Sequence, residues 1–310
     1  MEPLLVILGP TAIGKTRVAI DVATQLEGEI ISADSMQVYR HFNIGTAKPS
    51  QAEMQGIPHH LIDFIEPTEK FNVARFQREV MRLVPSIVER GHLPMLVGGT
   101  GLYISAVVDN YDFSPDGPNP SLRKQLLDKA SKLGSEALHN QLSQLDPVAA
   151  KRIQPTDTRR IIRALEVAIS GGQISASGHG PPLYRTLQIG LTRERKRLYK
   201  AINQRVDDMF ARGLCQEAQQ LLARGLSQDL PAFQALGYKE LLPYLQGKAS
   251  LDEVKEKLKR QTRRFAKRQL TWFRRDSRII WFDLDQYHSV KALATEIAQL
   301  AEGKLLLNRE

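Results

Sequence analysis

The chain has 310 residues, a mass of 34.9 kDa and a formal net charge of +9 at pH 7. Its length allows one large domain and a smaller one, and its single cysteine, Cys215, excludes an internal disulfide and a zinc site built from several thiolates. No apolar run reaches the roughly 20 residues that a membrane helix needs, so we expect no membrane anchor and a cytoplasmic location.

The first hundred residues alternate short apolar runs with helical patterns, which is typical of an α/β protein with a parallel sheet. We predict strands at residues 4–8, 29–32 and 93–97. Helical patterns occupy residues 16–26 and 73–89. The sequence therefore predicts a P-loop-type parallel sheet core flanked by helices.

The most specific motif lies between the first predicted strand and the helix that follows it. It consists of Gly9, Pro10, Thr11, Ala12, Ile13, Gly14, Lys15 and Thr16. The backbone N–H groups of such a loop surround an anion, the lysine adds a positive charge, and the threonine hydroxyl can ligate Mg²⁺. The loop recognises a diphosphate but not the group attached to it, so the motif leaves ATP binding open.

Asp34 directly follows the second predicted strand, at the edge where open α/β sheets bind their ligands. Two interpretations remain open for it. Asp34 or its neighbour Ser35 caps the next turn of the chain, or Asp34 takes part in chemistry beside the phosphate loop.

The third predicted strand ends without an acidic residue. An ATPase or GTPase of this fold usually has a metal-binding carboxylate at the end of a second apolar strand. Here the strand continues into Gly98, Gly99, Thr100 and Gly101. This departure weakens the hypothesis of nucleotide hydrolysis, and the glycines either approach a ligand or form a tight, closely packed turn.

A helical region interrupts the α/β pattern. Residues 114–120 are almost all turn formers and mark a domain boundary. Helical patterns follow at residues 121–133, 135–145 and 158–169, with Ser121 and Asp157 as predicted N-caps. An apolar strand at residues 187–191 then resumes the α/β pattern, and a last strand lies near residues 279–282. We therefore predict a discontinuous core of residues 1–113 and 185–310 with an all-helical insertion domain of residues 114–184.

The positive charge of the chain is concentrated near its C-terminus. Residues 255–278 contain eleven basic and two acidic residues, which together equal the net charge of the entire chain. Such a run is often only a solvated helix face. Like charges spaced four apart destabilise a helix, however, and a phosphate backbone would relieve their repulsion. The segment therefore indicates a polyanionic partner.

Together these motifs resemble the tRNA dimethylallyltransferase family, also called the tRNA isopentenyltransferase family. The similarity extends over most of the chain and includes residues 9–16, 34–39, 45–49, 59–63, 98–103, 159–166, 237–238 and 263–273. The resemblance implies transfer of a dimethylallyl group from dimethylallyl diphosphate to the exocyclic amine of the adenosine on the 3′ side of a tRNA anticodon. It also implies release of diphosphate, Mg²⁺ as the cofactor and a monomeric enzyme.

The resemblance further implies roles for individual residues. The phosphate loop would hold the diphosphate, Asp34 would be the general base, and Arg193 would bind the diphosphate together with Lys15 and Thr16. The helical insertion would grip the anticodon stem-loop. The residues implied to contact tRNA are Asp34, Ser35, Met36, Gln37, Thr100, Arg123, Arg159, Arg160, Ile161, Ile162, Arg163, Gly237, Tyr238, Arg263, Arg264, Lys267 and Arg268.

Three other functions share part of this pattern. A small-molecule kinase shares the phosphate loop but has no use for the basic segment. A prenyltransferase acting on free adenine nucleotides shares the chemistry but needs no helical insertion. A nucleic-acid-binding NTPase would need the missing metal carboxylate.

Overall fold

The computed structural model describes residues 1–113, 119–172, 174 and 178–306. The chain divides into two compact units. The core unit comprises Met1–Val108 and Pro182–Glu310, and the helical unit comprises Asp109–Pro181. Most of the turn-forming residues 114–120 lie outside the described residues. No helix in the described part of the chain is both long and apolar enough to cross a membrane.

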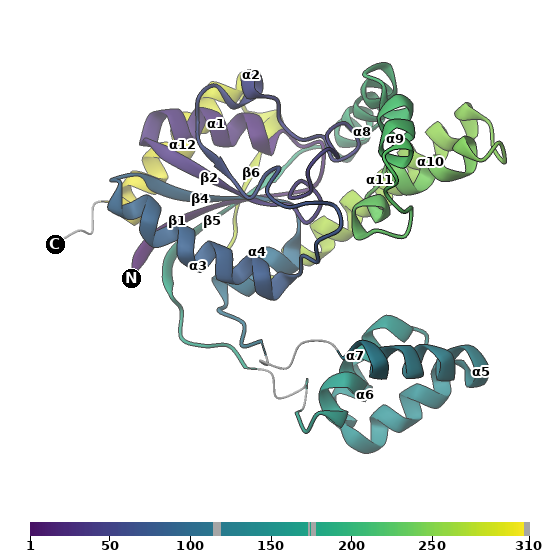
Figure 1. Ribbon diagram of the computed structural model, residues 1–310. Helices are drawn as coiled ribbons and strands as arrows, with labels where there is room; N and C mark the ends of the chain where they lie inside the picture. Colours follow the sequence, from purple (N-terminus) through teal and green to yellow (C-terminus); the bar gives the residue numbers. More distant parts are fainter. Residues whose placement is uncertain (114–118, 173, 175–177, 307–310) are drawn as a thin grey trace. The chain divides into compact units, whose positions relative to one another are not determined.

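A six-stranded sheet forms the centre of the core unit (Figure 1). The strand order is β3-β2-β4-β1-β5-β6, and all neighbouring strands are parallel, as the sequence predicted. The strands are β1 (Glu2–Leu8), β2 (Gly28–Ala33), β3 (His59–His60), β4 (Leu93–Gly98), β5 (Tyr184–Thr192) and β6 (Ile280–Asp283). Because β1 pairs with both β4 and β5, the phosphate loop leaves the middle of the sheet.

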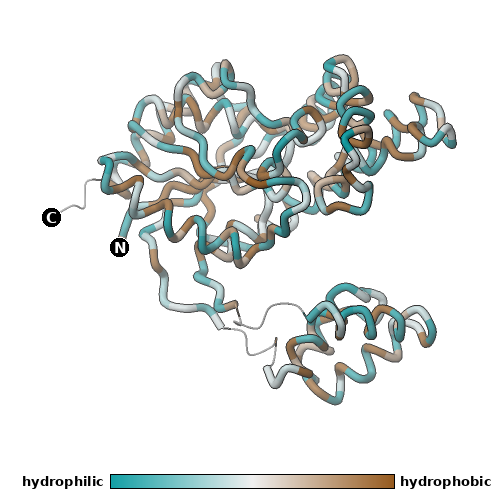
Figure 2. The backbone as a smooth tube through the Cα atoms, in the orientation of Figure 1, coloured by the Kyte–Doolittle hydropathy of each residue, from teal (hydrophilic) through white to brown (hydrophobic). Residues whose placement is uncertain are grey.

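Helices cover both faces of this sheet. Helices α1 (Lys15–Leu26) and α12 (Val290–Ala301) lie on one face, and α3 (Val73–Glu89) and α4 (Gly101–Val108) lie on the other (Figure 1). The strands form the apolar centre of the unit, whereas the outer turns of the helices are more hydrophilic (Figure 2). Helix α3 begins after Asn72, whose side chain accepts a hydrogen bond from the Arg75 amide at 2.9 Å.

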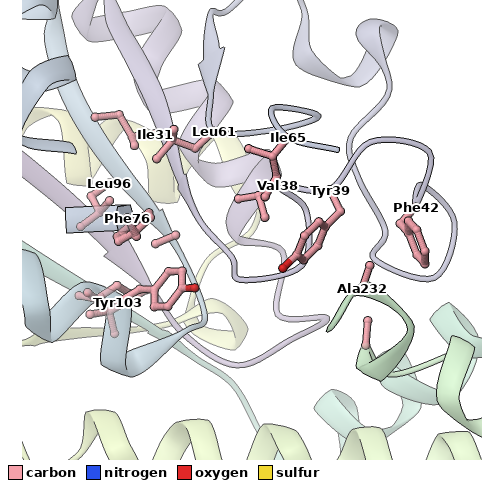
Figure 3. Packing of buried hydrophobic residues seen from close by; sticks show 14 of the residues in the cluster. Ile31, Val38, Tyr39, Phe42, Leu61, Ile65, Phe76, Leu96, Tyr103 and Ala232 are labelled. Atoms are coloured by element: carbon pink, nitrogen blue, oxygen red, sulfur yellow. The ribbon is translucent and has the colours of Figure 1, made fainter. Parts of the chain in front are cut away.

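The turn after β2 is part of the core on the α3 face. Val38, Tyr39 and Phe42 are buried there together with Phe76 and Tyr103 (Figure 3). The rings of Phe76 and Tyr103 are stacked with their centroids 4.5 Å apart. This packing anchors the segment that directly follows Asp34.

The C-terminal half of the core unit is mostly helical. Besides β6 and α12, it contains α8 (Arg195–Ala211), α9 (Leu214–Ala223), η2 (Pro231–Gln234), α10 (Tyr238–Leu245), α11 (Leu251–Phe273), η3 (Leu284–Gln286) and the π-helical turn η4 (Glu302–Leu306). A short helix, α2 (Gln51–Met54), lies between β2 and β3. Helix α11 begins with a capping box formed by Ser250 and Glu253, and it buries one face at three- and four-residue spacing.

The helical unit contains α5 (Pro120–Leu145), α6 (Pro147–Arg152) and α7 (Thr158–Ile169). The two helices predicted before and after residue 134 form α5, which has a kink where Gly134 has φ of 81°. Asp157 caps α7 as predicted, because its side chain accepts a hydrogen bond from the Arg160 amide. The prediction for Ser121 was wrong. Asn119 caps α5 instead, and Pro120 occupies the first helical turn, where its missing N–H costs nothing.

Candidate functional site

The phosphate loop joins β1 to α1 through two glycines with positive φ. Gly14 has φ of 101°, a left-handed conformation that favours glycine. A Cβ atom added to Gly9 would lie only 2.9 Å from the carbonyl oxygen of Leu191. The loop is thus closely packed against β5, and α1 begins at Lys15 with its N-terminus in the site.

Two cations from different elements converge beside the loop. The Lys15 ammonium group donates a hydrogen bond to the Pro10 carbonyl at 2.9 Å. Burial and the nearby Arg205 lower the pKa of Lys15 to about 7, although Asp34 opposes this shift. Burial also lowers the pKa of Arg205, which comes from α8. Within the described residues, the Arg205 guanidinium has no ion-pair partner within 4.0 Å, so this cation is available to an anion.

Two cavities meet at Arg205 and Met209. The loop cavity, of about 490 Å³, is lined by Gly14, Lys15, Thr16, Lys48, Arg205 and Arg212 among others. The Asp34 cavity, of about 360 Å³, is lined by Thr11, Asp34, Thr100, Arg205, Phe265 and Arg268 among others. Because Arg205 lines both cavities, an anion on the loop and a second ligand beside Asp34 can be neighbours.

Both interpretations of Asp34 fit its geometry. Its Oδ1 atom accepts hydrogen bonds from the Met36 amide at 2.9 Å and the Gln37 amide at 3.3 Å. This oxygen therefore caps a turn. The Oδ2 atom has no hydrogen-bond partner in the described part of the chain, and Asp34 lines the second cavity. The carboxylate is thus held by one oxygen and leaves the other available to accept a proton.

Close packing explains the glycines after β4. A Cβ atom at Gly98 would overlap with the backbone of Ala33, and one at Gly101 would overlap with the indole of Trp272. A metal-binding carboxylate therefore does not fit at Gly98. Thr100, between them, accepts a hydrogen bond from the Ser35 amide at 3.2 Å and lines the Asp34 cavity.

The structure places Arg193 away from both cavities. Its guanidinium pairs with Asp285 at 3.3 Å, and Asp285 also pairs with Arg197 at 3.0 Å. Arg193 is not among the residues that line either cavity. Arg205 of α8, in contrast, lines both cavities.

Arg205 was missed in the sequence analysis, although a signal was present. The buried apolar residues of α8 are Leu198, Ile202, Val206 and Met209. Arg205 lies three residues after Ile202 and four before Met209, so it belongs to the same helix face. A cation within an apolar stripe near a phosphate loop indicates a buried anion partner.

The basic helix α11 has two different faces. On the side facing α8, Lys259 pairs with Asp207 at 2.9 Å and Arg263 donates to Asn203 at 2.6 Å. Lys255 lies over the ring of Phe210 at 5.4 Å. The remaining exposed cations form an outer stripe, defined as Lys257, Arg260, Arg264, Lys267 and Arg268. Of the four predicted tRNA contacts in α11, therefore, Arg263 supports the fold and the other three are exposed.

Other predicted contact residues lie in different environments. Gly237 is the N-cap of α10, and Tyr238 is completely buried with its hydroxyl on Glu217. Glu217 in turn accepts a hydrogen bond from the Ile44 amide at 2.9 Å. An added Cβ at Gly45 would overlap with the Tyr238 ring. Tyr238 thus packs behind Gly45, which lines the Asp34 cavity, and the Tyr238 side chain is not exposed.

Within the helical unit, α7 separates its predicted residues by exposure. The side chains of Ile161 and Ile162 are buried in the core of the unit, whereas Arg159 and Arg160 are exposed. This difference in exposure follows from the helix periodicity, since the two isoleucines belong to the apolar stripe of α7. Arg123 pairs with the buried Glu166 at 2.7 Å, and Arg163 approaches the same carboxylate at 3.5 Å. Both arginine side chains remain partly exposed.

Comparison with known proteins gives consistent results. A family model for IPP transferase matches residues 37–276, and one for isopentenyl transferase matches residues 2–68. The tRNA dimethylallyltransferase of Pelotomaculum thermopropionicum is 49% identical to this chain over 98% of both proteins. That of Carboxydothermus hydrogenoformans is 53% identical over 91% of this chain and 92% of the relative.

Solved structures show the same similarity. The tRNA isopentenylpyrophosphate transferase of Bacillus halodurans has a TM-score of 0.75 and 46% identity, covering 98% of this chain and 97% of the other. A eukaryotic dimethylallyltransferase acting on tRNA has a TM-score of 0.80 and 29% identity, covering 100% of this chain and 81% of the other.

Proposed function

Because the chain belongs to the tRNA dimethylallyltransferase family, we propose that it transfers a dimethylallyl group from dimethylallyl diphosphate to adenosine in tRNA. The acceptor is the exocyclic amine of the adenosine on the 3′ side of the anticodon, and diphosphate is released. The observation that supports this proposal is that Arg205 lines both the phosphate-loop cavity and the Asp34 cavity, where Asp34 Oδ2 has no hydrogen-bond partner among the described residues.

In this proposal the loop cavity binds the diphosphate of the donor. The loop amides, Lys15 and Arg205 supply donors and positive charge, whereas Arg193 remains in its ion pair with Asp285. Thr16 would be the protein ligand for Mg²⁺, and the diphosphate and water would supply the other ligands, as is common for this ion. The described residues contain no cluster of three or more His, Cys, Asp or Glu side chains for a metal, which fits such a substrate-held ion. When bound, Mg²⁺ would neutralise charge on the diphosphate.

The chemistry needs one bond to break and one to form. The allylic C–O bond of the donor breaks, and its electron pair leaves with the diphosphate, whose new charge Lys15 and Arg205 stabilise. The adenine amine forms the C–N bond and loses a proton. Asp34 Oδ2 accepts that proton, because an amine conjugated with the adenine ring is a weak nucleophile that a base assists.

The acceptor would enter from the side of α11. The outer stripe would bind tRNA phosphates, and the exposed Arg159 and Arg160 of the helical unit would contact the anticodon stem-loop. The adenosine must leave its stack to reach Asp34, at a cost of a few kcal/mol that the phosphate contacts offset. A tRNA substrate also implies action in the cytoplasm, and we expect the enzyme to act as a monomer.

A comparison of two acceptors tests the proposal. Purified protein with Mg²⁺ and dimethylallyl diphosphate is incubated with unmodified tRNA or with adenosine monophosphate, and the products are analysed by mass spectrometry. We expect one adenosine beside the anticodon to gain a C₅H₈ unit and the free nucleotide to remain unchanged. Efficient prenylation of the free nucleotide, or no prenylation of tRNA, would contradict the proposal.

A further inference from the structure

The side chain of Gln269 connects two segments of the site. Gln269 comes from the inner face of α11, and only 7% of it is exposed. Its Oε1 atom accepts a hydrogen bond from the Thr11 amide at 2.9 Å. Its Nε2 atom donates a hydrogen bond to the Gly99 carbonyl at 2.8 Å. A single amide thus joins the phosphate loop to the turn after β4.

The backbone around Gln269 leaves room for this amide. A Cβ atom added to Gly99 would overlap with Gln269 Nε2 and would lie 3.3 Å from the carbonyl oxygen of Gly9. The loop, the turn and the helix therefore meet without space for another carbon atom. Such packing fixes the distance between the loop and the turn more tightly than a surface contact would.

The two segments joined by Gln269 carry different parts of the proposed reaction. Thr11 belongs to the phosphate loop that would hold the diphosphate, and it also lines the Asp34 cavity. Gly99 precedes Thr100, whose hydroxyl accepts a hydrogen bond from the backbone amide of Ser35, the residue after Asp34. We infer that Gln269 is a positioning residue, which holds the diphosphate loop at a fixed distance from the Asp34 turn. This inference rests on the proposed function and assigns Gln269 no contact with substrate.

The same helix would then serve two purposes through opposite faces. Lys267 and Arg268 are exposed, whereas Gln269 is buried against the loop. A change at Gln269 should therefore affect diphosphate binding and the transfer step while leaving tRNA binding intact. A helix that merely loosened would lose tRNA affinity as well.

The test uses Gln269→Met, which keeps the length of the side chain but removes both hydrogen bonds. The control is Gln77→Met, because Gln77 is equally buried, at 6% exposed, and donates to the Ala106 carbonyl at 2.9 Å, away from the loop. Three quantities are measured for each full-length protein: the affinity for inorganic diphosphate with Mg²⁺, the affinity for tRNA, and the single-turnover rate at saturating substrates. The melting temperature of each variant measures how much stability is lost with the buried amide.

For Gln269→Met we expect diphosphate affinity to fall about tenfold and the single-turnover rate to fall at least about tenfold, since small displacements of a site can cost up to about 10²-fold. Its tRNA affinity should stay within about twofold. Gln77→Met should lower the melting temperature but keep all three quantities within about twofold. Wild-type diphosphate affinity and rate in Gln269→Met would overturn the inference, as would an equal loss of tRNA affinity.

A second variant approaches the same contact from the other side. Gly99→Ala adds a Cβ that displaces the Gln269 amide, so it should weaken diphosphate binding as Gln269→Met does. The diphosphate affinity of the double variant should fall by much less than the product of the two single-variant decreases, because the contact can be removed only once. Independent, multiplicative losses would overturn the inference even if Gln269→Met folds poorly. If the wild-type protein itself does not bind diphosphate, the proposed function fails instead.

Discussion

At the scale of single residues, Asp34 shows how one carboxylate can be both structural and reactive. Its Oδ1 atom caps the turn through the Met36 and Gln37 amides, and its Oδ2 atom remains available. The turn therefore fixes the carboxylate without using the oxygen that would accept the proton.

Replacing Asp34 with asparagine separates these two roles. Asp34→Asn keeps an oxygen for the turn and removes the base, so folding and substrate affinities should stay within several fold. Turnover should fall by roughly 10²- to 10⁴-fold, the typical effect of a lost general base. Single-turnover kinetics at saturating substrates measure this effect. Near wild-type turnover would mean that Asp34 only caps the turn and is not the general base.

Arg205 and Arg193 are alternative candidates for the arginine that binds the diphosphate. Arg205→Gln should raise the KM for dimethylallyl diphosphate by about 10- to 100-fold, because a hydrogen bond to a charged group is worth about 1.5–3 kcal/mol. Arg193→Gln, which breaks the pair with Asp285, should change this KM less than about threefold. Steady-state kinetics of the two matched variants decide between them, and the reverse ranking would restore the role predicted for Arg193.

The low pKa of Lys15 predicts a pH dependence for donor binding. In the free enzyme, burial and Arg205 bring this pKa to about 7, so the amine loses its charge above that pH. A bound diphosphate favours the charged form and raises the pKa. Binding above pH 7 therefore takes up a proton, and the Kd for diphosphate should rise by up to about tenfold per pH unit. Isothermal titration calorimetry at a series of pH values above 7 measures this Kd. Lys15→Met should bind weakly with a flatter profile, and an equally steep profile would exclude Lys15 as the source.

At the scale of elements, α11 combines a structural and an electrostatic role. Its inner cations contact α8 through Asp207, Asn203 and Phe210. In the described part of the chain, no cation of the outer stripe forms an ion pair or cation–π contact with α8, and Arg268 lies over the Phe265 ring of its own helix at 5.7 Å. Solvent ions or a polyanion can relieve the repulsion among these cations. We therefore expect the outer cations of α11 to contribute more to tRNA binding than the inner ones.

Two triple variants with the same loss of charge test this division. Replacing Arg260, Arg264 and Lys267 with glutamine should weaken tRNA binding and reduce the log–log salt slope by roughly two units, since each lost phosphate contact removes about 0.7–0.9. Replacing Lys255, Lys259 and Arg263 should lower thermal stability and change the slope by less than about one unit. A filter-binding salt series provides both slopes. Equal slopes for the two variants would mean that the outer stripe does not bind phosphates.

At the scale of the whole molecule, the sequence predicted the sheet, the phosphate loop and the family. Those features depend on local patterns, such as the apolar strands and the loop glycines. It did not predict Arg205 or Gln269, because their roles depend on which helix faces meet the loop in the folded chain. The family resemblance implied tRNA contacts for Ile161 and Tyr238, whose side chains are buried in the structure.

In the proposed reaction, the phosphate loop binds an allylic diphosphate and not a nucleotide. The most direct measurement quantifies diphosphate release and adenosine prenylation in one reaction that contains purified protein, tRNA, Mg²⁺ and dimethylallyl diphosphate but no nucleotide. We predict one diphosphate released for each adenosine prenylated, with no change when ATP is added. A requirement for ATP, with one nucleotide cleaved per turnover, would show that the loop serves a nucleotide instead.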